Sequence, residues 1–165
     1  MRKLVLLSTT AALVMLTGFN ANATTNVTAD SQAKVTIVDA VAMDHETGKA
    51  LDFGTAMSAI NHTITIDPAT GEQTSSDEGQ IVTEGDRDHF TVTVPADMNL
   101  TITLPGESLS LGTGLSVTQF TSSPAGTLNA TKDGPNDIYV GGTLAVSQGA
   151  ASGDYAQSYT LTISY

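Results

Sequence analysis

The sequence predicts an all-β protein, an antiparallel β-sandwich of about seven to nine strands. Apolar and polar side chains alternate over several short stretches, which is the pattern of a half-buried strand. Turn-forming residues separate these stretches, and after the first 23 residues no stretch has its apolar side chains at helical spacing. Short alternating strands with frequent turns over about 140 residues are typical of a sandwich.

The first 23 residues have the parts of a secretory signal peptide. Arg2 and Lys3 provide a basic start, an apolar run follows, and Ala21-Asn22-Ala23 is a small-x-small cleavage site. The apolar run is shorter than the roughly 20 residues that cross a bilayer, and hydroxyl residues interrupt it. We therefore expect an exported protein whose mature chain begins at Thr24, found in the periplasm in transit and then at the cell surface or outside the cell.

The mature chain is strongly acidic and has no cysteine. Two of the six basic residues lie in the signal, so four basic side chains remain against seventeen acidic ones, a formal charge of −13 with neutral histidines. Such a surface repels nucleic acid and anionic membranes, and we exclude both as partners. Without cysteine there is no disulfide framework and no thiol chemistry, so burial of apolar surface must stabilise the fold.

Residues 24–37 alternate from nearly the first residue of the mature chain, although new N-termini are usually irregular. Ser31 belongs to the odd-numbered series, whose other members from position 27 onward are apolar. These are Val27, Ala29, Ala33, Val35 and Ile37. The segment is either the first strand of its own domain, or residues 24–33 are an extension that inserts into a neighbouring molecule while 34–165 form the sandwich.

The next elements are short. We expect a turn at 44–49, a short strand at 51–54, and a strand on which Ile60, Ile64 and Ile66 share one face with His62. Turn chemistry at 67–71 ends that strand. Residues 72–88 are polar and acidic, which predicts a long exposed connection.

The clearest hairpin prediction joins an alternating stretch at 90–94 to another at 100–104 through Pro95-Ala96-Asp97. A further strand begins at Leu115, and Phe120 falls out of phase with Val117, which predicts a bulge or bend. A weak strand around residue 128, a turn at 132–136 and apolar pairs between 138 and 146 follow.

The last eleven residues alternate most regularly. The large side chains on the odd positions predict a strand with one buried face that lies inside its sheet. They are Tyr155, Tyr159, Leu161, Ile163 and Tyr165.

Catalytic and metal-binding patterns are weak, and we expect neither an enzyme nor a cofactor. His45, His62 and His89 lie in separate segments, and His62 is better explained as a hydrogen-bonded strand residue than as a ligand. Asp86 and Asp88, in the acidic stretch, resemble the start of a calcium loop, but the further ligands of such a loop do not follow. A solvated acidic loop is the favoured interpretation of that stretch.

Several strand and turn motifs, in this order, resemble a bacterial family called domain of unknown function 4402. The motifs are Leu51-Asp52-Phe53-Gly54-Thr55, Ile64-Thr65-Ile66-Asp67-Pro68, Phe90-Thr91-Val92-Thr93, Leu100 to Pro105, Val140-Gly141-Gly142-Thr143-Leu144 and Gly153 to Tyr165. That family is similar to spore coat protein U and to pilin subunits of chaperone-usher systems. The resemblance implies an immunoglobulin-like subunit of a Gram-negative surface fibre, folded with a periplasmic chaperone and passed to an outer-membrane usher.

Two functions are consistent with the sequence. The first is a structural fibre subunit that assembles by β-strand addition through its N-terminal segment. The alternative is a self-complete secreted β-sandwich that binds a carbohydrate, calcium or a host surface. The first needs a sheet edge that lacks a strand, and the second needs a closed sandwich with a ligand site.

Overall fold

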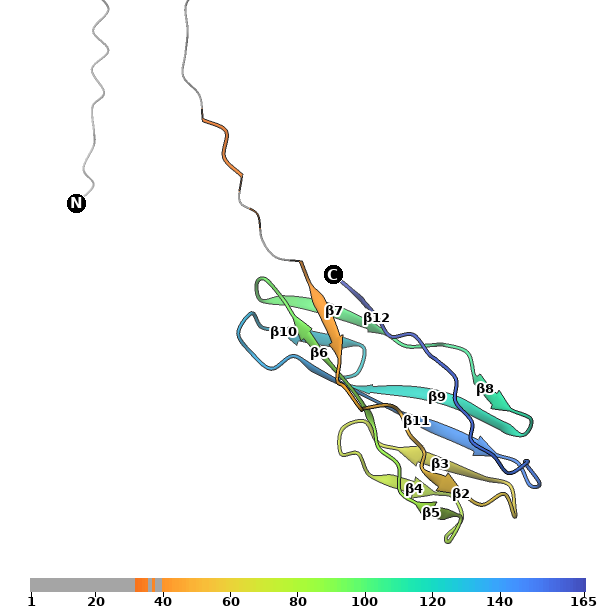
Figure 1. The fold of residues 1–165 in the computed structure, drawn as a ribbon. Coiled ribbons are helices and arrows are strands. Elements are labelled where there is room, and N and C mark those ends of the chain that lie inside the picture. Colours follow the sequence, from red (N-terminus) through yellow and green to blue (C-terminus); the bar gives the residue numbers. More distant parts are fainter. Residues whose placement is uncertain (1–31, 36, 38–39) are drawn as a thin grey trace, which may run out of the picture. The chain divides into compact units, whose positions relative to one another are not determined.

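The computed structural model describes residues 32–35, 37 and 40–165, and residues 37–165 form one compact unit. This unit is built from strands, turns and bends, with no helix in the described part of the chain (Figure 1). Accordingly, no described helix is long and apolar enough to cross a membrane. The predicted antiparallel all-β fold is confirmed.

The larger sheet has seven strands. Its order is β1-β6-β11-β3-β4, with β9 on the other side of β11 and β8 beyond β9. The strands are β1 (Ala42–His45), β3 (His62–Ile66), β4 (Gln73–Ser75), β6 (Asp88–Thr93), β8 (Leu109–Gly112), β9 (Leu115–Ser123) and β11 (Asp137–Val146). Every pairing in this sheet is antiparallel, and the long strand β11 lies at its centre.

The second sheet has three strands in the order β10-β7-β12. They are β7 (Met98–Thr103), β10 (Thr127–Ala130) and β12 (Thr162–Ser164). A cluster of buried side chains joins the two sheets, with Val92 from β6 and Leu100 from β7 among its members. Burying an aliphatic side chain of this size contributes roughly 1.5–3 kcal/mol, so this interface holds the sandwich together.

The predicted hairpin of 90–94 with 100–104 is wrong in its pairing. Both strands exist, but β6 pairs with β1 and β11, while β7 pairs with β10 and β12. Their apolar faces meet across the sandwich instead of side by side in one sheet. The Pro95 connection therefore crosses from one sheet to the other.

The bulge predicted near Phe120 is confirmed. Opposite β11, the register of β9 shifts so that Thr143 pairs with Gln119 and Leu144 with Val117. Thr118 is thus the extra residue, and it brings Phe120 back to the inner face after Val117. Both phenylalanine and valine then pack in the core.

The connection predicted to be long and exposed at 72–88 contains β4, β5 (Ile81–Thr83) and the first residue of β6. β5 pairs with β2 (Thr55–Ala56), which makes a third, two-stranded sheet. These strands have only two or three residues, too few to show alternation. They raise the number of strands in the described chain to twelve, above the predicted seven to nine.

Two further local predictions need correction. Residues 51–54 form only a bridge between Asp52 and Asp86, because Gly54 has a φ of 67° and turns the chain. A Cβ at Gly54 would lie 2.1 Å from the Thr83 carbonyl oxygen. Ile60 lies before β3 and is 39% exposed, whereas Ile64 and Ile66 are fully buried.

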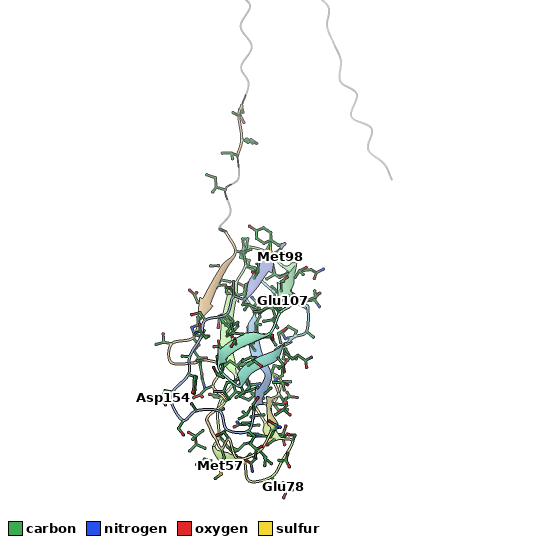
Figure 2. All side chains as sticks on the ribbon, turned by 90° about the vertical axis from the view of Figure 1, so that its right-hand side faces the viewer. Met57, Glu78, Met98, Glu107 and Asp154 are labelled. Atoms are coloured by element: carbon green, nitrogen blue, oxygen red, sulfur yellow. The ribbon has the colours of Figure 1, made fainter. Side chains whose placement is uncertain are left out.

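Figure 2 shows the two ends of the domain. Met57 and Glu78 lie at one end and Met98 at the other. In Figure 1, β1 begins at the same end as the C-terminal residue, and the last fifteen residues run along the domain toward that end.

Candidate functional site

Among the described residues, the C-terminal segment before β12 has no partner strand. There, Thr162–Ser164 pair with β7 alone, so within the described sheets β12 is an edge strand and not the internal strand that the sequence predicts. Among the described residues, no backbone–backbone hydrogen bond involves residues 151–160. In this stretch large and small side chains alternate as in a β-strand, but no described strand lies beside it to pair with its backbone N–H and C=O groups.

The five predicted core residues of this segment are in the predicted phase but are buried to different extents. Leu161 is buried, and Tyr159 and Ile163 are partly buried against the main core cluster. Tyr155 is 37% exposed and Tyr165 is 81% exposed. The prediction of five large buried side chains is therefore wrong for Tyr155 and Tyr165.

Tyr159 anchors the segment to the larger sheet through Asp88, the first residue of β6. The Tyr159 hydroxyl donates to Asp88 Oδ2 at 2.5 Å. Asp88 Oδ1 accepts the backbone N–H of His89 at 2.8 Å and lies 2.6 Å from His45 Nε2 on β1. One carboxylate thus joins β1, β6 and the C-terminal segment.

Asp88 is only 3% exposed, and a charge removed from water needs hydrogen-bond partners to compensate. Its three contacts come from groups that can donate. Burial, with the hydrogen bond to Asp88, raises the pKa of Tyr159 far above its usual range. The tyrosine therefore keeps its proton at physiological pH and serves as a permanent donor to the carboxylate.

The inner face of β1 is incompletely covered. Met43 pairs with Val92 and His45 with Phe90, so both side chains point toward the sandwich interior. Nevertheless, Met43 is 38% exposed and the side chain of His45 is 48% exposed. The three-stranded sheet opposite does not extend over this part of β1.

The contacts of Asp88 link these features, which together are here called the edge strip. It consists of the inner face of β1 (Met43 and His45), the buried Asp88, and the inward side chains of residues 155–165. In Figure 1 the orange arrow of β1 and the dark blue C-terminal segment are the two elements that contribute to this strip. Within the described part of the chain each of these two strands is a sheet edge, since β1 pairs there only with β6 and β12 only with β7.

Tyr155 holds the beginning of the segment. Its ring packs on Gly112 of β8, where an added Cβ would lie 2.7 Å from Tyr155 Cε1, and its hydroxyl donates to the Ala151 carbonyl at 2.7 Å. Side-chain contacts at 155 and 159 therefore position a segment whose backbone is unpaired.

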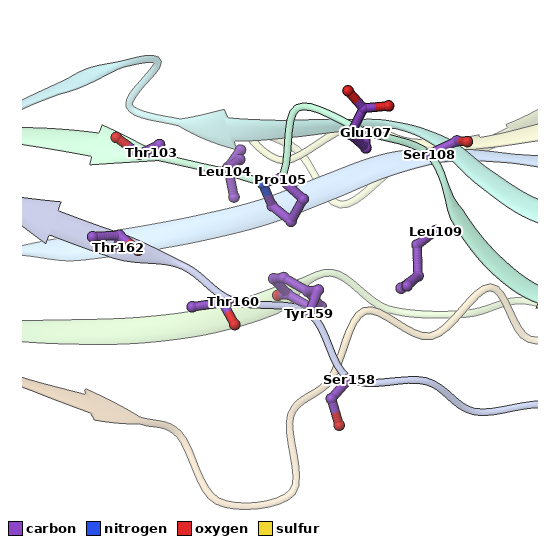
Figure 3. A pocket seen from close by; sticks show the side chains of 10 residues that line it. All are labelled: Thr103, Leu104, Pro105, Glu107, Ser108, Leu109, Ser158, Tyr159, Thr160 and Thr162. Atoms are coloured by element: carbon purple, nitrogen blue, oxygen red, sulfur yellow. The ribbon is translucent and has the colours of Figure 1, made fainter.

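A hollow of about 440 Å³ lies on the opposite side of the segment, where β7 and the C-terminal chain separate. Figure 3 shows Tyr159 among Leu104, Pro105 and Leu109 at this hollow, with the Glu107 carboxylate turned away. Pro105 has no N–H to continue the β7 ladder, which explains why pairing stops after Thr103.

A second polar cluster lies on the outer face of β6 and β11. His89 Nε2 lies 2.9 Å from Asp137 Oδ1, and His89 Nδ1 contacts the Glu46 carboxylate. Burial lowers the pKa of His89, but its hydrogen bonds with Asp137 and Glu46 and the charges of these two groups outweigh that effect and raise the pKa above its usual value. The two carboxylates contact opposite ring nitrogens, so they do not converge on one point.

The Tyr139 ring lies between two cationic or titratable groups in the same cluster. His89 stacks on it at 4.5 Å, and the Arg87 guanidinium carbon lies 3.8 Å from its centroid. Lys49 Nζ donates to Asp86 Oδ2 at 2.6 Å, and this bond lowers the pKa of Asp86. The hollow beside this cluster measures about 380 Å³ and is mostly polar.

Residues 41–165 match the protein family described as "Domain of unknown function (DUF4402)". The chain belongs to the DUF4402 family. This confirms the resemblance predicted from the strand and turn motifs. Searches of the curated proteins and of the solved structures gave no match.

The DUF4402 domain separates the two aspartates that the sequence offered as a weak calcium site. Asp86 is exposed and paired with Lys49, whereas Asp88 points inward to Tyr159. Within the described residues no three histidine, cysteine, aspartate or glutamate side chains are grouped so as to hold a metal ion. His62 is 5% exposed on β3 and its Nδ1 donates to the Ile60 carbonyl at 3.1 Å, as a strand residue would.

Two of the five proposed strand-exchange residues lie outside the described part of the chain, and the other three lie in its described N-terminal stretches. Val27 and Ala29 are not described, residues 32–35 have no regular secondary structure, and Ile37 is 88% exposed. The role of Val27, Ala29, Ala33, Val35 and Ile37 in strand exchange remains a prediction.

The Asp88 anchor was not predicted from the sequence, although a signal was present. Asp88 has the same parity as Phe90 and Val92, which places it on the inner face of the same strand. The neighbouring acidic residues obscured this parity and favoured a loop. Its partners His45 and Tyr159 lie 43 and 71 positions away, and no sequence pattern connects them.

Proposed function

We propose that this DUF4402 protein is a structural subunit of a bacterial surface fibre that assembles by β-strand addition. In this proposal, the N-terminal segment of one copy pairs with the free edge of β12 and the preceding C-terminal segment of another copy. The observation that carries the proposal is the unpaired stretch 151–160, which is patterned as a strand and has no strand neighbour among the described residues.

The strand order supports this interpretation. An immunoglobulin sandwich has strands A, B, E and D in one sheet and C, F and G in the other. Here β1-β6-β11-β9 follow the order A-B-E-D, and β7-β12 follow C-F. Within residues 40–165 no strand occupies the place of G, beside β12. A strand supplied by another copy at that place would complete the second sheet.

The exposed inner face of β1 also supports placing the added strand beside β12. A strand added to the free side of β12 would widen the three-stranded sheet toward β1. It would cover the exposed parts of Met43 and His45, which already point into the sandwich. Added backbone hydrogen bonds and buried apolar surface would both favour association.

The proposed partners follow from this chemistry. An exported subunit with an open sheet edge is prone to misassociation, so we propose that a periplasmic chaperone covers the edge strip. We further propose that at an outer-membrane usher the N-terminal segment of the next subunit replaces the chaperone. Export of the chain, its surface location and the absence of an enzymatic role belong to the same proposal.

Deletion of residues 24–33 in the full chain tests the proposal. The variant should fold and bind a chaperone, because residues 40–165 contain the whole described sandwich, but it should not form fibres. Electron microscopy and size-exclusion chromatography measure both outcomes. Fibres of normal length from the deletion variant, or a wild-type protein that remains a closed monomer at high concentration, would favour the self-complete secreted sandwich instead.

A further inference from the structure

The edge strip has apolar side chains at its β12 end and one buried charge. Leu161, just before β12, and Ile163, within it, contribute to the core. At the end of β1, the buried Asp88 lies between Tyr159 and His45. A strand added here must place some side chain over that carboxylate.

The Asp88 carboxylate has capacity for one more hydrogen bond. An ionised carboxylate offers about four lone-pair sites, and three contacts are present, from His45, the His89 N–H and the Tyr159 hydroxyl. His45 is half exposed in the isolated domain, so an added strand would remove it from water as well. A hydroxyl group at this point would add a fourth hydrogen bond to a charged group, whereas an apolar side chain would add none.

From position 27 onward, the odd-numbered series of the N-terminal segment has one polar residue, and that residue carries a hydroxyl. Positions 27, 29, 33, 35 and 37 are Val, Ala, Ala, Val and Ile, whereas position 31 is Ser. Ser31 lies outside the described residues, and its position in the sequence places it in the same alternating series. The fourteen residues 24–37 are enough to cover residues 155–165.

We infer that Ser31 of one copy lies opposite Tyr159 of the next and sets the register of strand addition by meeting the Asp88 carboxylate. This inference rests on the proposed strand addition and names its register. With the added strand antiparallel to β12, Ala29 lies beside Leu161 and Val27 beside Ile163. Ala33 and Val35 then lie beside Gln157 and Tyr155.

The antiparallel direction follows from the two ends of the domain. β1 begins at the end where the C-terminal residue lies, and Met57 and Glu78 mark the opposite end (Figures 1 and 2). An antiparallel added strand leaves the edge strip at the Met57 end, so its own domain follows there. Each copy then donates at one end and accepts at the other, which allows the assembly to continue as a head-to-tail fibre.

Disulfide mapping tests the register in the full chain, because the protein has no cysteine of its own. Ser158 and Thr160 are exposed and flank Tyr159, so cysteines there leave the anchor intact. The inferred register pairs position 30 with 160 and position 32 with 158. We therefore expect the double variants Asp30→Cys/Thr160→Cys and Gln32→Cys/Ser158→Cys to give covalent ladders of fibre subunits on a denaturing gel.

Other cross-links distinguish failure of the register from failure of strand addition. A register two residues away would join 28 or 32 to 160, and a parallel strand would join 32 to 160 and 30 to 158. Ladders from those pairs would overturn the inferred register and leave strand addition standing. No ladder from any pair, or disulfides within single chains only, would overturn both the register and the proposed assembly.

A hydroxyl substitution gives a second measurement. Ser31→Val should speed dissociation of the added strand about tenfold, the factor expected from the loss of one hydrogen bond to a charged group. Ala33→Val is the matched control, since it adds apolar bulk at a position in the same series where no carboxylate is expected. Equal dissociation rates for Ser31→Val and wild type would contradict the role of Ser31.

Discussion

The Tyr159 hydroxyl and the Asp88 carboxylate, 2.5 Å apart, connect the unpaired C-terminal segment to the first strand residue of β6. The carboxylate is buried, so its hydrogen bonds fix the position of the segment although the backbone of residues 151–160 is unpaired. The edge of the sheet is therefore already in place before any strand is added to it.

Tyr159→Phe should destabilise the isolated subunit by about 1–3 kcal/mol, because it removes a donor from a buried carboxylate and leaves the ring in place. Urea unfolding at constant m-value measures the change. Tyr165→Phe is the matched control, since Tyr165 is 81% exposed, and it should stay within about 0.5 kcal/mol of wild type. Equal effects from both variants would show that the Asp88 contact does not hold the segment.

His89 should make stability depend on pH. The carboxylates of Asp137 and Glu46 raise the pKa of His89 in the folded state above its value in the unfolded chain. The stabilisation is then complete below the unfolded pKa, near 6.5, and is lost as pH rises through the folded pKa. Unfolding free energies measured across pH 5 to 9 should show this loss in wild type.

The variant His89→Gln provides the control for this prediction, since glutamine can hydrogen bond without titrating. Its unfolding free energy should lack the part of the pH dependence that is centred on the His89 titration. An NMR titration of the histidine should place its midpoint above the usual value. A midpoint below that value would contradict the arrangement of the two carboxylates.

Gly141→Ala should destabilise the domain strongly, by about 3 kcal/mol or more. A Cβ at this position in β11 would lie 2.2 Å from the Ile66 carbonyl oxygen, so backbone must move. Gly106→Ala is the control, because nothing lies within 4 Å of the added methyl group. Thermal unfolding of the two variants should separate them clearly, and similar midpoints would contradict the close approach of β11 to β3.

Alternation in the sequence predicted the inner face of most long strands but not their partners. Val92 and Leu100 were assigned to strands correctly, yet their proximity in sequence suggested a hairpin, whereas they face each other across the sandwich. The shift at Phe120 was predictable because a bulge changes the parity of buried positions. The parity of the apolar positions shows which side chains of a strand face the core. It contains no information about which other strand pairs with it.

The candidate site was predictable only in part, because alternation shows which side chains face inward but not which strands pair. Tyr159, Leu161 and Ile163 have the predicted inward phase, but the sequence could not show that residues 151–160 lack a partner. The contacts of His89 with Glu46 and Asp137 span 43 and 48 positions. Such distant pairs become visible only when the fold brings β1, β6 and β11 together.

Amide hydrogen exchange at residues 155–160 tests the central claim most directly, because an unpaired edge and a strand-covered edge differ in backbone protection. We predict rapid exchange of these amides in the isolated subunit and strong protection in the assembled fibre, with β11 protected in both. Protection of residues 155–160 in the isolated subunit, or rapid exchange within the fibre, would contradict strand addition at this edge.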